Sequence, residues 1–336
     1  MSTPDCDLRG KTALIVGIAN SDSLAWAAAT SLRGAGARLA ITYLNEKARP
    51  HVEPLARKAD ADLILECDVT KPGSLDAVFD AVAAKWDRLD LVFHGIASAP
   101  KSDLQGRLTD CSADGFAAAM MVSCYSLLHM ARRAEPLMRR GGSLITLSFF
   151  GSEKVVDHYN VMGPVKAALE SAVRYLAHEL GPAGIRVNAI SAGPVATRAA
   201  SGLTHFEELL NEAAAKSPLR RTIDASEVGK AALFLASDLS SGVTGEIVHV
   251  DAGFHIDGMI FSLRRETMMT VEDPVCRNTI PLENAHASEE YGGWAYFFCS
   301  NRCHTAFKLN PERYADARIP AAFSAPSDAS HPSRKA

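Results

Sequence analysis

Short apolar runs alternate with longer amphipathic segments over the first 260 residues, and this alternation constrains the fold more than any other feature. The runs have strand length and are almost unbroken, which is typical of strands covered on both faces. The pattern predicts an α/β fold, a doubly wound parallel sheet of about seven strands with right-handed crossovers. The predicted strands are Thr12–Gly17, Arg38–Tyr43, Leu63–Val69, Leu89–Ile96, Ser143–Phe149, Arg186–Ser191 and Glu246–Val250, and the clearest helices are Leu24–Arg33, Ser74–Trp86, Gly115–Arg133 and Ala167–Leu180.

The composition changes after about residue 260. A chain of 336 residues suits one domain of about 250 residues and a smaller one. We therefore expect a first domain over 1–260, a polar linker over 261–270 and a small domain over 271–316. The last segment, 317–336, is rich in Pro, Ser and Ala and is predicted to be disordered.

Charge and hydropathy exclude several classes of protein. The net charge is only −4, so nothing indicates a nucleic-acid partner, which would normally require a basic face. No stretch approaches the ~20 apolar residues needed to span a bilayer, and the first residues lack the apolar core of a secretory signal. We expect a cytoplasmic protein with no nucleic-acid or membrane partner, whose seven cysteines are reduced.

Small and polar residues follow several predicted strands, at the edge where parallel sheets bind ligands. The first strand runs into Gly17, Ala19 and Ser23, a turn before a helix where a phosphate can meet backbone N–H groups. The spacing is not G-x-G-x-x-G, so a plain tight turn with Ser23 as N-cap is the alternative. Asp68 can accept a hydrogen bond from an adenine amino group, and Gly95 lets a cofactor lie close to the backbone. This Rossmann-like pattern predicts a nicotinamide cofactor.

The end of the second predicted strand bears on the choice of cofactor. There is no Asp directly at the end of Arg38–Tyr43 to bind a ribose 2′-hydroxyl, and no Arg to favour a 2′-phosphate. Lys47 is available but lies several residues further on. We expect NADH, with NADPH as the alternative.

Tyr159 and Lys166 are the candidate catalytic pair. Seven residues are close to two turns of a helix, which predicts that both side chains project from one face with Cα atoms about 10 Å apart. Lys166 could then reach the nicotinamide ribose while Tyr159 reaches a substrate oxygen, and its ammonium would favour ionisation of the phenol. A surface lysine and a half-buried tyrosine are the alternative. Pro164 requires either that the helix starts near Gly163 or that Lys166 is displaced.

These stretches together resemble the bacterial enoyl-acyl-carrier-protein reductases, a divergent branch of the short-chain dehydrogenase/reductases. The resemblance spans residues 8–260. The Tyr-x6-Lys spacing is specific, because ordinary short-chain dehydrogenases use Tyr-x3-Lys. The matching stretches are Gly17–Ala25, Thr42–Lys47, Cys67–Val69, Tyr159–Gly163 with Lys166, Arg186–Val195 and Gly245–Phe254.

The resemblance implies an NADH-dependent reduction of trans-2-enoyl thioesters of acyl-carrier protein or coenzyme A in fatty acid biosynthesis, carried out by a homotetramer. It implies that Tyr159 donates a hydrogen bond to the thioester oxygen and that Lys166 holds the cofactor ribose. The implied cofactor-binding residues are Gly17, Ala19, Ser23, Leu24, Leu44, Asp68, Val69, Gly95, Ile96, Lys166, Val195 and Thr197, and the implied substrate-side residues are Ala99, Phe149, Met162, Leu203 and Phe206.

Two other functions are compatible with the sequence. One is a carbonyl or hydroxyl oxidoreductase of the short-chain dehydrogenase class, built on the same sheet. The other is a metal-sensing protein whose reductase fold has lost its activity; the presence of both Tyr159 and Lys166 argues against it.

Three cysteines characterise the small C-terminal segment. Cys299 and Cys303 are four residues apart, so a helix would place both sulfurs on one face. With Cys276 they form a set that suits a Zn or Cu ion, and the segment resembles the YHS domain, a small module associated with metal binding. The fourth ligand is left open among His286, His304 and Asp273. The alternative is that the three cysteines are simply buried among aromatic side chains.

Overall fold

The computed structural model describes residues 6–156, 158–195, 197, 206–256 and 270–315. The chain divides into two compact units, Met1–Gly258 and Met259–Ala336. The predicted linker apart from Thr270, the predicted disordered tail, and Leu203 lie outside the described residues.

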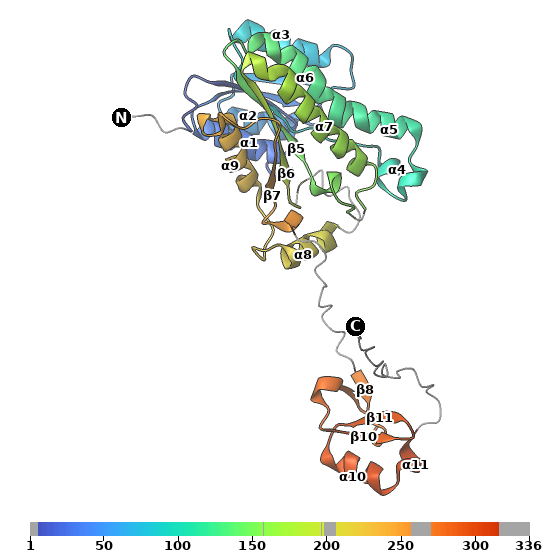
Figure 1. Cartoon of the computed structure of the whole chain (residues 1–336). Coiled ribbons are helices and arrows are strands. Elements are labelled where there is room, and N and C mark those ends of the chain that lie inside the picture. Colours follow the sequence, from blue (N-terminus) through green and yellow to red (C-terminus); the bar gives the residue numbers. More distant parts are fainter. Residues whose placement is uncertain (1–5, 157, 196, 198–205, 257–269, 316–336) are drawn as a thin grey trace, which may run out of the picture. The chain divides into compact units, whose positions relative to one another are not determined.

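A seven-stranded parallel sheet forms the centre of the first unit (Figure 1). Its strand order is β3-β2-β1-β4-β5-β6-β7, so the order reverses between β1 and β4, the point where such sheets bind ligands. The predicted fold class is confirmed. The strands are β1 (Thr12–Val16), β2 (Arg38–Tyr43), β3 (Leu63–Glu66), β4 (Leu91–His94), β5 (Gly142–Ser148), β6 (Ile185–Ala192) and β7 (Ile247–Val250).

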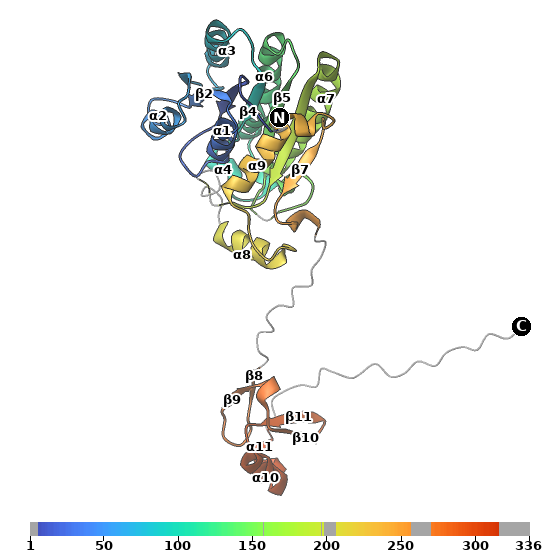
Figure 2. The same cartoon turned by 90° about the vertical axis from the view of Figure 1, so that its left-hand side faces the viewer.

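Helices cover both faces of this sheet (Figure 2). Because successive side chains of a strand point to opposite faces, Ala13 and Ile15 of β1 pack into one core and Leu14 and Val16 into the other. The first core is closed by α1, α2 and α9, the second by α3, α6 and α7. The helices are α1 (Leu24–Gly34), α2 (Arg49–Lys58), α3 (Ser74–Lys85), α4 (Lys101–Leu104), α5 (Ala113–Met120), α6 (Ser126–Ala134), α7 (Met162–Leu180), α8 (Phe206–Lys216) and α9 (Ala225–Ala236).

Several predicted boundaries differ from the structure, and the helix predicted over Ala167–Leu180 begins five residues earlier, at Met162. The predicted strands Leu63–Val69 and Leu89–Ile96 end earlier, at Glu66 and His94, because the chain leaves the sheet there and turns along its edge. The predicted helix Gly115–Arg133 is interrupted by a π-helical turn, Met121–Tyr125, between α5 and α6. Single π-helical turns inside α-helices occur frequently at functional sites.

The second unit is built from two short hairpins and two helices. Antiparallel pairs join β8 (Thr270–Glu272) to β9 (Thr279–Pro281) and β10 (Ala287–Tyr291) to β11 (Trp294–Phe298). The helices α10 (Asn301–Leu309) and α11 (Pro311–Tyr314) follow. Its small core contains Phe298, Phe307 and Cys303. Within the part of the chain that the structure describes, no helix has the length and apolar character needed to cross a lipid bilayer.

Candidate functional site

A cavity of about 640 Å³ opens at the carboxyl ends of the strands of the first unit. This volume is typical of small-molecule and cofactor sites. All but one of the predicted cofactor-binding residues line it: Gly17, Ala19, Ser23, Leu24, Leu44, Asp68, Val69, Gly95, Ile96, Lys166 and Thr197. Val195 does not line it and packs instead against the core beneath α1.

The turn after β1 is stabilised by the hydroxyl of Ser23. Its Oγ accepts hydrogen bonds from the backbone N–H groups of Ala19 and Asn20, both at 3.0 Å. Ser23 occupies the N-cap position of α1, but its hydroxyl makes no hydrogen bond to the first turn of that helix. Since Leu24 and Ala25 line the cavity, the N-terminus of α1 faces it and can bind a negatively charged group.

The two glycines of the cavity wall are required by packing between neighbouring turns. Gly17 has φ +106°, and a Cβ added there would lie 2.2 Å from the carbonyl oxygen of Gly95. A Cβ added to Gly95 would lie 2.9 Å from the Cβ of Ala25. The loops after β1 and β4 therefore approach each other closely, and the surface that they present to the cavity is mostly backbone.

Asp68 is held in place at the end of β3. Its Oδ1 accepts hydrogen bonds from the N–H and the hydroxyl of Thr70, at 3.0 and 2.6 Å. Lys71 lies 3.9 Å from Oδ2. The carboxylate is thus fixed at the cavity wall as a hydrogen-bond acceptor.

The helix that carries Lys166 begins at Met162, so Pro164 lies in its first turn. Proline is tolerated there because the first N–H groups of a helix have no partner within the helix. Tyr159, however, precedes α7 and lies in a turn between two residues in the left-handed region, His158 (φ 64°) and Asn160 (φ 41°). The prediction that Tyr159 and Lys166 share one helical face is therefore wrong.

Lys166 is buried, so the surface-lysine alternative is also wrong. Only 4% of its surface is exposed, and its Nζ donates a hydrogen bond of 2.7 Å to the carbonyl of Leu147 at the end of β5. Burial lowers the pKa of Lys166 to about 8, and Glu170 opposes this shift. The ammonium faces the cavity, with further N–H donors available for a ligand.

Tyr159 is half-buried, and its ring packs on that of Phe149, with 4.7 Å between the ring centroids. Burial raises the pKa of Tyr159 above its ordinary value, and Glu170 raises it further. The net shift of the phenol pKa is thus opposite to the ionisation that a nearby ammonium would favour, because burial and Glu170 determine it. The phenol therefore keeps its proton at neutral pH, so its hydroxyl is available to donate a hydrogen bond.

The predicted substrate-side residues lie in three places. Phe149 contacts Tyr159, and Met162 and Ala99 belong to one small apolar cluster against which Tyr159 packs. Phe206 is the first residue of α8, but its side chain lies outside the described part of the chain, as does all of Leu203.

The π-helical turn contributes to the cavity wall, and no sequence pattern predicted it. Val122 lines the cavity. The hydroxyl of Ser123 accepts from the N–H of Ser98 at 3.0 Å and donates to its carbonyl at 3.2 Å, which joins the turn to the loop after β4. Beneath them the buried ring of His94 contacts the hydroxyl of Ser126 at 2.8 Å.

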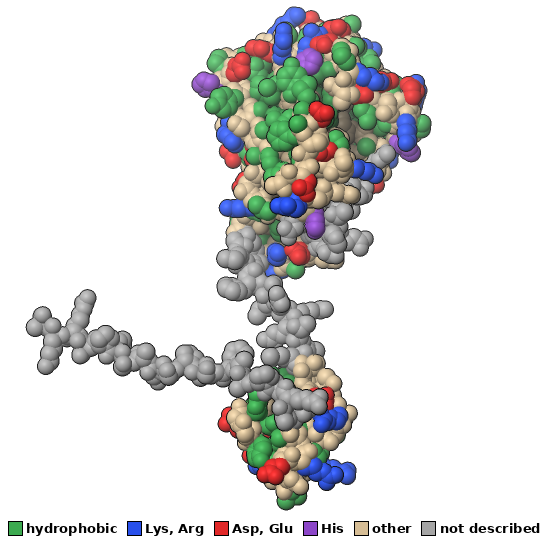
Figure 3. Space-filling view, turned by 90° about the vertical axis from the view of Figure 1, so that its right-hand side faces the viewer, with side chains coloured by type: hydrophobic (Ala, Val, Ile, Leu, Met, Phe, Trp, Pro, Cys, Tyr) green, Lys and Arg blue, Asp and Glu red, His purple; other side chains and the backbone are tan. Residues whose placement is uncertain are grey.

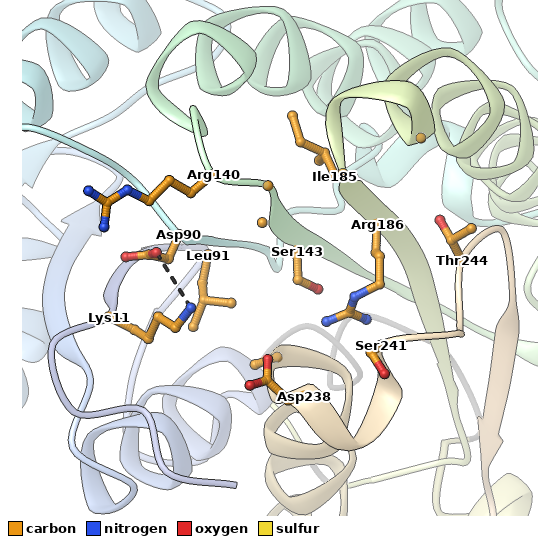
Figure 4. Close-up of a pocket in the computed structure, with 15 residues that line it drawn as sticks. Lys11, Asp90, Leu91, Arg140, Ser143, Ile185, Arg186, Asp238, Ser241 and Thr244 are labelled. Atoms are coloured by element: carbon orange, nitrogen blue, oxygen red, sulfur yellow. Dashed lines mark ion pairs between the residues drawn. The ribbon is translucent and has the colours of Figure 1, made fainter. Parts of the chain in front are cut away.

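A second cavity, of about 370 Å³, lies at the opposite ends of β4, β5 and β6, beside Leu91 and Ile185 (Figure 4). Three of its charged side chains, Lys11, Asp90 and Arg186, are engaged within the fold. Lys11 lies 3.9 Å from Asp90, and Arg186 donates to the carbonyl of Leu235 in α9 and to the hydroxyl of Ser240, both at 2.8 Å.

In the second unit, the side chains of Asp273, Cys276, Cys299 and Cys303 form a cluster whose potential ligand atoms all lie within 4.8 Å of one another. The Sγ atoms of Cys276 and Cys299 are 3.5 Å apart, and those of Cys299 and Cys303 are 3.8 Å apart. Tetrahedral coordination with Zn–S bonds of about 2.3 Å places sulfurs roughly 3.8 Å apart. The three thiols therefore fit a zinc-like ion.

Asp273 organises this cluster. Its carboxylate is buried and accepts hydrogen bonds from the backbone N–H groups of Val275 and Cys299, both at 2.8 Å. Its hydrogen bond to Cys299 raises the pKa of that thiol to about 12. His304, by contrast, is paired with Glu289 at 2.7 Å. Of the candidate fourth ligands, Asp273 is the one placed with the thiols.

Comparisons with known protein families match both units. Residues 17–255 match the family model described as Enoyl-(Acyl carrier protein) reductase, and residues 271–318 match the YHS domain. An enoyl-[acyl-carrier-protein] reductase [NADH] of Rhizobium meliloti is 50% identical over 252 residues, which cover 75% of this chain and 93% of the relative. Another, of Synechocystis, is 48% identical over 75% of this chain and 99% of the relative.

Solved structures of the same family are similar to the first unit of this chain. An enoyl-(acyl-carrier-protein) reductase of Anaplasma phagocytophilum in complex with NAD is 50% identical, with a TM-score of 0.73 and coverage of 75% of this chain and 96% of that one. The Bacillus cereus enoyl-acyl carrier protein reductase, solved with NADP+ and an indole naphthyridinone, is 46% identical, with a TM-score of 0.74 and coverage of 75% and 100%.

Proposed function

The chain belongs to the enoyl-acyl-carrier-protein reductase family, and we propose that it reduces trans-2-enoyl thioesters of acyl-carrier protein, or of coenzyme A, with NADH in fatty acid biosynthesis. The observation that carries this proposal is the buried side chain of Lys166 in the wall of a cofactor-sized cavity that is also lined by ten other predicted cofactor-binding residues. Bound NADH would supply a hydride to the β-carbon of the substrate.

In this proposal Lys166 binds the cofactor ribose. One of its N–H groups is committed to the carbonyl of Leu147, which fixes the direction of the side chain. The remaining donors can bind ribose hydroxyls. Asp68 would accept a hydrogen bond from the adenine amino group, and the N-terminus of α1 would bind the pyrophosphate.

Tyr159 would donate its proton in a hydrogen bond to the thioester oxygen, where negative charge develops as the hydride arrives. Donors fixed in advance at such a position stabilise the transition state because they need no reorganisation. The raised pKa of the phenol supports this role, since the proton stays on the tyrosine at neutral pH.

The end of β2 supports NADH as the cofactor. The nearest arginine, Arg49, lies over the ring of Tyr43 and is paired with Glu53 at 2.8 Å. A cation engaged in this way is poorly placed to bind the 2′-phosphate that distinguishes NADPH.

The test is NADH oxidation with a panel of enoyl thioesters, with ketones and alcohols included to detect a carbonyl or hydroxyl oxidoreductase. Tyr159→Phe is expected to lower kcat and leave NADH binding nearly intact, whereas Lys166→Ala is expected to weaken NADH binding. Protein that binds NADH but turns over no enoyl thioester of any chain length would disprove the activity, and the reverse pattern in the two variants would disprove the roles.

We also propose that residues 271–316 form a separable domain that binds one Zn or Cu ion through Cys276, Cys299 and Cys303. The sulfur spacing and the match to the YHS domain support it. Thiolate ligation and folding are coupled in small metal domains. Elemental analysis should therefore find about one ion per chain, lost in the triple Cys→Ser variant and retained in a Cys111→Ser control. Equal metal content in all three proteins would exclude these ligands.

We further propose that the chain assembles as a homotetramer in the cytoplasm. All seven cysteines are free, as suits a reducing compartment. Exposed apolar side chains gather over α5, α6 and α7, a face visible in Figure 3; such patches mark contacts with other chains. They include Met121, Tyr125 and Tyr175, with exposures of 53%, 48% and 75%. Tyr175→Glu should reduce the mass measured by light scattering, whereas Leu309→Glu in the second unit should not.

A further inference from the structure

Glu170 is a buried carboxylate to which the proposed mechanism assigns no role. It lies on α7 four residues after Lys166, and residues at this spacing share a helical face. Only 5% of its surface is exposed, against 4% for Lys166. An ionised carboxylate is costly to bury unless hydrogen bonds and an opposite charge compensate for lost hydration. The surroundings of Glu170 provide both.

Two serine hydroxyls hold the carboxylate. Ser148, the last residue of β5, and Ser152 each donate a hydrogen bond of 2.5 Å to Oε1 of Glu170. Hydrogen bonds to an ionised acceptor are short and strong. Glu170 therefore fastens the end of β5 and the turn Phe150–Ser152 to α7.

The fastened turn supports the ring of Tyr159. A Cβ added to Gly151, the residue before Ser152, would lie 2.4 Å from Cδ1 of Tyr159, so the turn and the ring are in close contact. Phe149, on the other side of Gly151, packs on the same ring. Movement of this turn would move the phenol relative to the cavity.

Glu170 also differs in charge from the other titratable groups near Lys166. His94 on β4 and Cys124 in the π-helical turn interact electrostatically with Lys166, and Tyr159 interacts with Glu170 itself. Burial lowers the pKa of His94 to about 3 and raises the pKa of Cys124 and of Tyr159, so all three are neutral near pH 7. The negative charge that acts on the ammonium is therefore that of Glu170.

We propose that Glu170 is a positioning residue of the reductase site: through Ser148 and Ser152 it fixes the turn behind Tyr159, and through its charge it keeps the buried Lys166 in the ammonium form. This inference rests on the proposed function, because the ammonium matters only if it binds the cofactor. The two contributions can be separated, since one depends on hydrogen bonding and the other on charge.

The experiment uses the full chain and four variants, with the NADH dissociation constant and kcat measured from pH 6 to 10. Glu170→Gln keeps an acceptor for both serines and removes the charge, so the pH at which NADH binding is lost should fall by on the order of one unit. Ser152→Ala keeps the charge of Glu170. It should lower kcat and leave the pH midpoint of NADH binding unchanged. Glu170→Asp should also keep the wild-type midpoint. Glu179→Gln, on the exposed part of the same helix, should match wild type.

Folded Glu170→Gln protein with the wild-type pH midpoint would overturn the role of the charge. If that variant did not fold, a wild-type kcat in Ser152→Ala, or a shifted midpoint in Glu170→Asp, would still overturn the proposal. Failure of the wild-type chain to bind NADH or to reduce any enoyl thioester would count against the proposed function instead, so the two failures are distinguishable.

Discussion

Replacing Gly151 with alanine tests whether the position of the Tyr159 ring sets the rate. The added Cβ would lie 2.4 Å from Cδ1 and 2.8 Å from Cε1 of the ring, whereas ordinary contact begins at 3.4 Å. The ring must therefore move by about 1 Å, and a displacement of a reacting group on this scale costs on the order of 10²-fold in rate. We expect Gly151→Ala to lower kcat by about that factor.

NADH binding should stay within about twofold of wild type, because the substitution lies outside the residues that line the cofactor cavity. Stopped-flow turnover of an enoyl thioester and fluorescence titration of NADH measure the two quantities separately. Gly34→Ala is the matched control, since a Cβ there meets nothing within 4 Å. A wild-type kcat in Gly151→Ala would refute the placement of the ring, and an equal loss of NADH affinity would indicate a wider rearrangement.

Four further outcomes are expected. NADH affinity should fall about tenfold between pH 7 and 9, because Lys166 loses its charge as the pH rises through its pKa of about 8; a flat titration would contradict this. Gly17→Ala should abolish NADH binding, measured by calorimetry, since its Cβ would overlap the carbonyl of Gly95. Asn160→Ala should cost about 1–2 kcal/mol in thermal unfolding and lower kcat, because the side chain donates a 2.7 Å hydrogen bond to a carbonyl of α4 and supports a left-handed backbone. Asp273→Ala should destabilise the second unit by roughly 1–3 kcal/mol in a melt of the chain, as its backbone N–H partners lose their acceptor.

The sequence by itself determined the sheet and most of the cofactor cavity. Buried parallel strands are short apolar runs, and their carboxyl ends meet at one edge, so residues such as Gly17, Asp68 and Gly95 could be assigned to one site from chain order alone. The Tyr-x6-Lys spacing indicated the family without any coordinates, and the comparisons confirmed that family.

Only the tertiary structure decided the features that depend on contacts between distant segments. Helical periodicity placed Tyr159 on the helix of Lys166, but its ring is held by Phe149 and Gly151 in a turn. Burial reversed the expected effect on the phenol pKa, because desolvation depends on everything packed around a group. For the same reason, Glu170 had no local signal: its partners lie 18 and 22 residues away in the chain, and only folding brings their hydroxyls to its carboxylate.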